Sequence, residues 1–78
     1  MTHNYIADME SIQQGLRNEG YWEAAKNLGD RVIEGSTGGE ILMGVRYELR
    51  VILRDTPVSG ELREQILQLI ELLVSSGV

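Results

Sequence analysis

The stretch TGGEILMGVRYELRVIL, residues 37–53, decides the fold class of this chain. Thr37 opens it and Glu40 follows three residues later, the pattern of a capping box, in which each side chain satisfies a free amide of the first helical turn. The apolar residues after it share one face of a helix: Ile41, Leu42, Val45, Leu49, Ile52 and Leu53. The sequence therefore predicts an amphipathic helix over residues 38–54, which ends before Pro57.

Three more helices are predicted on either side of this one, because apolar residues recur there at helical spacing. They cover residues 4–18, 21–34 and 60–75, and short connections near Gly20, Gly35 and Pro57 separate the four segments. Short connections make consecutive helices antiparallel neighbours. The expected architecture is an all-α, compact four-helix up-and-down bundle that forms one domain over residues 1–78.

The apolar stripe of the second predicted helix contains the only tryptophan. It consists of Trp22, Ala25, Val32 and Ile33, with Tyr21 and Leu28 at its edge. We expect Trp22 to lie in the core. Tyr21 must point elsewhere, because adjacent residues of a helix lie about 100° apart. Glycines inside the helices, at positions 15, 29 and 44, predict close approach between helices, since glycine there otherwise costs about 1 kcal/mol.

Charge and composition narrow the classes of partner. Twelve acidic residues against seven basic ones give a net charge of −5, which disfavours binding to nucleic acid or to an anionic membrane and favours a basic protein. The sequence has no cysteine, no apolar run long enough to span a membrane and no export signal after Met1. These observations predict a cytoplasmic protein.

The residues that usually carry catalysis are nearly absent. The only histidine, His3, lies close to the N-terminus, and no cysteine can act as nucleophile or thiolate ligand. The glycine-rich segment at residues 35–39 is followed by Glu40 rather than lysine, so it predicts a turn and helix cap and not a phosphate-binding loop. We therefore expect no enzyme activity, no cofactor and no metal site.

Two predicted helix faces are candidates for binding. Glu23, Asp30 and Glu34 project to one side of the second helix, either as a solvated face or as a row of charges that imitates phosphates for a basic partner. On the third helix, three arginines, Arg46, Arg50 and Arg54, lie beside a group of Met43, Tyr47 and Val51. This face either binds a partner or pairs its arginines with acidic residues of neighbouring helices.

Residues 35–49, GSTGGEILMGVRYEL, and residues 18–28, NEGYWEAAKNL, resemble small acidic helical immunity proteins. These belong to bacterial contact-dependent growth inhibition and related polymorphic-toxin systems. The resemblance implies a cytosolic antitoxin that binds a cognate toxin domain, often a basic nuclease, and blocks it stoichiometrically.

Two functional hypotheses follow. The first is such an immunity protein, with Glu23, Asp30 and Glu34 as charged contacts and Tyr21 and Tyr47 as aromatic anchors. The second is a regulatory or adaptor protein that forms a weak homodimer or docks helices through surfaces around Arg50, Tyr47 and Leu67. In the second hypothesis the fourth helix supplies its apolar excess, including Leu67 and Val74, to another chain.

Overall fold

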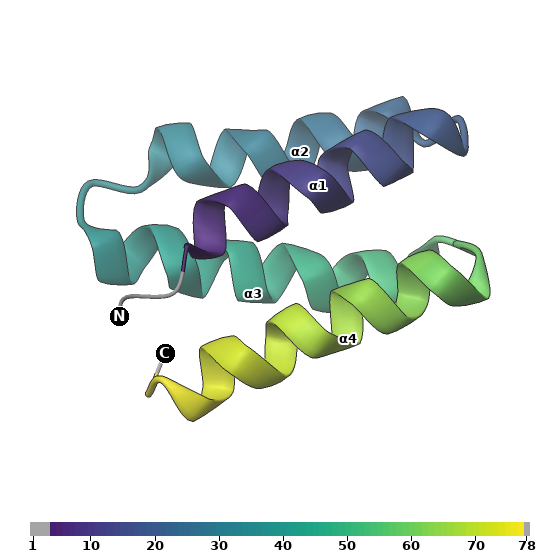
Figure 1. Cartoon of the computed structure of the whole chain (residues 1–78). Helices are drawn as coiled ribbons and strands as arrows, with labels where there is room; N and C mark the ends of the chain where they lie inside the picture. Colours follow the sequence, from purple (N-terminus) through teal and green to yellow (C-terminus); the bar gives the residue numbers. More distant parts are fainter. Residues whose placement is uncertain (1–3, 78) are drawn as a thin grey trace.

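The computed structural model describes residues 4–77, which form four α-helices and, within that range, no strand. The helices are α1 (Tyr5–Asn18), α2 (Trp22–Glu34), α3 (Gly38–Asp55) and α4 (Gly60–Ser75) (Figure 1). Each predicted boundary lies within one residue of the observed one. α2 packs between α1 and α3, and α4 returns to pack against both α3 and α1. The predicted all-α four-helix bundle is confirmed.

Side chains cap three of the four helices at their N-termini. Asn4, Thr37 and Ser59 each accept a hydrogen bond from a backbone amide three residues later. The capping box of α3 is confirmed, because the Thr37 hydroxyl accepts from the Glu40 amide at 3.1 Å and, besides Ser36, the Thr37 amide helps to lower the pKa of the Glu40 carboxyl. The Glu40 carboxylate also bonds to Ser36, accepting from its hydroxyl at 2.6 Å and from its amide at 3.2 Å. The glycine-rich turn is thereby tied to the first turn of α3.

The core is aliphatic and receives residues from all four helices. Its buried members are Met9, Ile12, Leu16, Ala25, Leu28, Val45, Leu49, Ile52, Leu62, Ile66, Leu69 and Leu73. The prediction that Trp22 lies in the core is wrong, because its side chain is 65% exposed. Ile33, also assigned to the buried stripe, is 82% exposed. Leu28 is fully buried instead, so the buried face of α2 is rotated away from Trp22.

Two glycines allow the close helix approach that the sequence predicts. A Cβ atom at Gly15 would lie 2.9 Å from Cδ1 of Leu62 on α4, and one at Gly29 would lie 2.7 Å from Nε2 of Gln13 on α1. Gln13 is buried and donates a hydrogen bond to the Ala25 carbonyl at 2.9 Å. Its amide therefore fills the space that Gly29 leaves between α1 and α2. None of the helices described in residues 4–77 is long and apolar enough to cross a membrane.

Candidate protein-binding face

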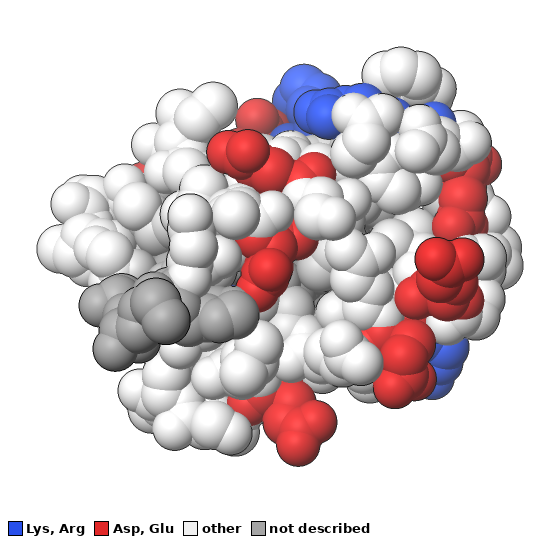
Figure 2. All heavy atoms as spheres, viewed as in Figure 1, with Lys and Arg blue, Asp and Glu red and all other residues white. Residues whose placement is uncertain are grey.

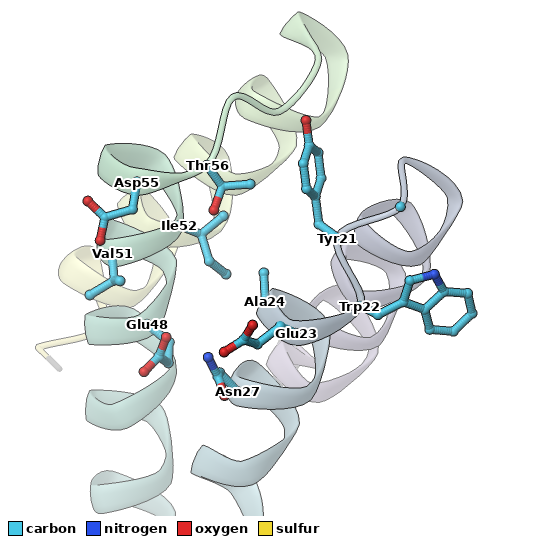
Figure 3. A pocket seen from close by; sticks show the side chains of 11 residues that line it. Tyr21, Trp22, Glu23, Ala24, Asn27, Glu48, Val51, Ile52, Asp55 and Thr56 are labelled. Atoms are coloured by element: carbon cyan, nitrogen blue, oxygen red, sulfur yellow. The ribbon is translucent and has the colours of Figure 1, made fainter.

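A groove of about 450 Å³ lies between the first half of α2 and the second half of α3. Apolar side chains of both helices line it, among them Ala24, Val51 and Ile52. Figure 3 shows Glu23 and Asn27 of α2 directed toward Glu48 of α3, so polar groups of the two helices face each other there. The groove thus combines an apolar lining with three carboxylates, those of Glu23, Glu48 and Asp55.

Glu48 is held by an arginine from the opposite helix. Arg31 of α2 donates from Nε at 3.1 Å and from Nη2 at 2.8 Å, and both bonds end on Oε1 of Glu48. Glu48 is only 8% exposed. The hydrogen bond to Glu48 raises the pKa of Arg31 above its ordinary value, so the guanidinium keeps its charge at any physiological pH.

Tyr47 and Gly44 complete the surroundings of Arg31. The guanidinium carbon of Arg31 lies 5.1 Å from the centre of the Tyr47 ring, within the range of a cation–π contact. A Cβ atom at Gly44 would come within 3.3 Å of Cδ of Arg31. Gly44 therefore provides the space through which Arg31 crosses from α2 to α3.

The predicted acidic residues of α2 differ in how strongly they are paired. Asp30 accepts a hydrogen bond from Lys26 at 2.9 Å, an interaction that raises the pKa of Lys26. Glu23 and Glu34 are exposed and form no ion pair within residues 4–77. Glu23 lines the groove, whereas Glu34 lies more than two helical turns further along α2. The negative charge of this face therefore comes mainly from Glu23 and Glu34.

The aromatic residues of this face have different roles. Tyr21 lines the groove, but its hydroxyl donates to the Pro57 carbonyl at 2.9 Å and so joins the connection before α2 to the one after α3. Tyr47 is 58% exposed on the outer surface of α3. Trp22 stands at the rim, and Figure 3 shows its indole pointing away from the groove. Trp22 and Tyr47 are the exposed aromatic side chains among the described residues, and Tyr21 is only partly exposed.

Two of the α3 arginines, Arg50 and Arg54, form no ion pair with another helix within the described residues. Arg54 pairs with its neighbour Asp55 in the same helix, with Nε–Oδ1 at 2.8 Å, and not with another helix. Arg50 is exposed and forms no ion pair within the described range. Arg31 and Glu48 form an ion pair that joins two helices, and sequence reasoning missed it. Glu48 immediately precedes Leu49 of the apolar stripe, and a charge at that edge was the available signal.

Acidic residues are not confined to α2. α4 carries three exposed glutamates, Glu61, Glu64 and Glu71, against a single arginine, Arg63. Figure 2 shows acidic side chains along the edge of the molecule that α4 follows in Figure 1. Acidic charge therefore lies on more than one face, and the groove distinguishes the α2–α3 face from α4.

No group of three or more acidic, histidine or cysteine side chains that could hold a metal ion occurs among the described residues. His3, expected to be solvated and inert, lies outside them. Comparison with protein-family models, curated proteins and solved structures finds no match. The surface chemistry of α2 and α3 is therefore the basis for a functional proposal.

Proposed function

We propose that this protein is an immunity protein, which binds a basic bacterial toxin domain through its α2–α3 face and neutralises it stoichiometrically. The observation that carries the proposal is the groove in which the unpaired Glu23 stands beside the exposed Trp22. Tryptophan and tyrosine are enriched among residues that dominate binding energy at protein interfaces. The resemblance of residues 18–28 and 35–49 to immunity proteins supports the same function.

Electrostatic attraction would raise the rate of association with the toxin domain and would orient the two proteins as they approach. Unpaired carboxylates on a helix attract a basic surface over roughly one Debye length, about 8–10 Å at physiological salt. Nucleases hold polyanions and so present basic clefts. Glu23 and Glu34 would approach such a cleft first, and Trp22 and Tyr47 would then bury apolar area against its edge. A toxin blocked in this way loses access to its substrate.

Co-expression with the toxin candidate encoded next to the gene tests the function directly. Growth should be restored by the cognate pair and not when the toxin is replaced by one from an unrelated locus. Purified protein should also bind the toxin domain at a one-to-one ratio. Absence of both rescue and binding would remove the immunity hypothesis.

A matched pair of variants tests whether the α2–α3 face is the one that binds the toxin domain. Glu23→Lys/Glu34→Lys and Glu61→Lys/Glu64→Lys change the net charge equally but on different helices. We expect the α2 variant to slow association with the toxin domain about tenfold or more in low salt and much less in high salt. The α4 variant should have a smaller effect. Equal effects would show that net charge, and not the α2–α3 face, governs binding.

The adaptor hypothesis is favoured by one observation, the apolar exposure of α4. Leu67 is 41% exposed and Val74 48% exposed, and they lie two helical turns apart on one side of the helix. Self-association through this side predicts a dimer in sedimentation that Leu67→Glu dissociates. A strict monomer at high concentration would eliminate it.

A further inference from the structure

We propose that the α2–α3 groove is a receptor for one long cationic side chain, lysine or arginine, of the partner protein. The inference rests on the proposed function and deepens it, because it names the group that the face recognises. The groove has about 450 Å³ of space, within the range of sites that enclose small ligands. A groove of this size accommodates one extended side chain together with part of its backbone.

The carboxylates select for positive charge. Glu23 approaches from the α2 wall and Glu48 from the α3 wall, and Asn27 of α2 also points toward Glu48, as Figure 3 shows. The Glu48 side chain is 11% exposed, and both hydrogen bonds from Arg31 end on Oε1, which leaves Oε2 able to accept from a ligand. An anion would be repelled here, and an apolar group would cover the carboxylates without satisfying them.

The remaining walls select for a long stem. Ala24, Val51 and Ile52 supply apolar surface beside the carboxylates. Lysine and arginine bury their methylene stems along such surface while the charged head reaches polar groups. Arg31 lies beyond the groove lining and holds Glu48 from that side, so the site keeps its shape when empty.

A small-molecule titration of the full chain tests charge selection without the toxin. The probes are N-acetyl-arginine amide and N-acetyl-citrulline amide, which have similar shapes and differ in charge. In amide NMR spectra, the arginine probe should give saturable shifts at groove residues and bind about tenfold more tightly than the citrulline probe. Equal binding of both probes, or shifts as large on α4 as in the groove, would overturn the proposal.

Variants of exposed or partly exposed residues locate the site. Glu23→Gln should weaken binding of the arginine probe about tenfold, and Glu64→Gln on α4 should leave it unchanged. Ala24→Phe should fill the groove and abolish binding, whereas Ala7→Phe, an exposed position on α1, should not. Retained binding in both Glu23→Gln and Ala24→Phe would contradict the receptor, and Glu23→Gln is informative even if Ala24→Phe does not fold.

The same variants separate this inference from the immunity function. Loss of toxin binding in Ala24→Phe, with binding kept in Ala7→Phe, supports the receptor. Full toxin binding by a folded Ala24→Phe would refute it while the immunity function stands. If no toxin binds but the arginine probe still enters the groove, the receptor stands and the immunity function falls.

Discussion

Trp22 shows that a residue which sequence periodicity places in the core can instead lie on the surface. It occupies the first position of α2, and the core edge next to it is taken by Tyr21. A side chain with 65% exposure gains little from folding. Its size therefore contributes less to stability than that of a buried core residue.

Replacing Trp22 with alanine should change the free energy of unfolding by no more than about 0.5 kcal/mol, as for other surface positions. Leu49→Ala, at a fully buried core position, should cost about 2–5 kcal/mol. Urea unfolding followed by circular dichroism measures both. A large loss of stability in Trp22→Ala would mean that the indole is packed in solution.

Arg31 and Glu48 form the other residue-level feature, a partly buried pair that joins α2 to α3. The side chain of Arg31 is 35% exposed and that of Glu48 is 11% exposed. Water therefore screens the pair from the arginine side, and its loss should cost less than the roughly 3–5 kcal/mol typical of fully buried pairs. Glu48 has no second cationic partner within residues 4–77.

Arg31→Met should lower the free energy of unfolding by about 1–3 kcal/mol, because it leaves the Glu48 carboxylate buried without its donor. Adding Glu48→Met in the same chain should recover much of that loss, since the buried charge is then removed as well. Chemical denaturation of the single and double variants gives the coupling energy. Purely additive losses would show that the pair contributes nothing specific.

Among the helices, α3 has a clearly capped N-terminus, and its first turn contains a carboxyl group, that of Glu40, which responds to pH. Hydrogen bonds from the Ser36 hydroxyl and amide lower the pKa of the Glu40 carboxyl below its ordinary value of 4.5. A carboxyl with a depressed folded-state pKa stabilises the protein above its unfolded pKa. That contribution is lost as the pH falls through the folded pKa.

We expect the carboxyl carbon of Glu40 to titrate by NMR with a midpoint below 4.5, and Ser36→Ala to move that midpoint upward. The Ser36→Ala protein should also lose less stability than the unchanged protein when the pH is lowered from about 5 to about 3. A midpoint that is the same in both proteins would show that Ser36 does not hold the carboxylate in solution.

For the whole molecule, the set of helices that contact one another predicts fast folding. Three of the four main helix contacts, α1 with α2, α2 with α3 and α3 with α4, join consecutive elements, and the fourth, α1 with α4, spans the chain. Bundles dominated by such local contacts fold in microseconds to milliseconds. The main refolding phase after dilution from urea should therefore fall within about 10 ms in stopped-flow circular dichroism. A main phase of seconds would contradict this topology-based expectation.

Much of the fold could be predicted because its signals are local. Thr37 and Ser59 mark helix starts, Pro57 marks the end of a helix, and apolar spacing within one segment indicates its buried side. The candidate site was predicted only in part. Glu23, Glu34 and Tyr47 are exposed as the face assignment required, whereas Trp22 was misplaced and Glu48 was overlooked.

The sequence by itself determined the four helices, their boundaries and an aliphatic core, because capping and periodicity act within a few residues of the chain. The tertiary structure alone decided how far each helix is rotated about its axis. That rotation exposes Trp22, and it brings together Arg31 and Glu48, which are 17 residues apart. Rotation depends on how side chains of neighbouring helices interlock, and spacing along one helix does not specify that packing.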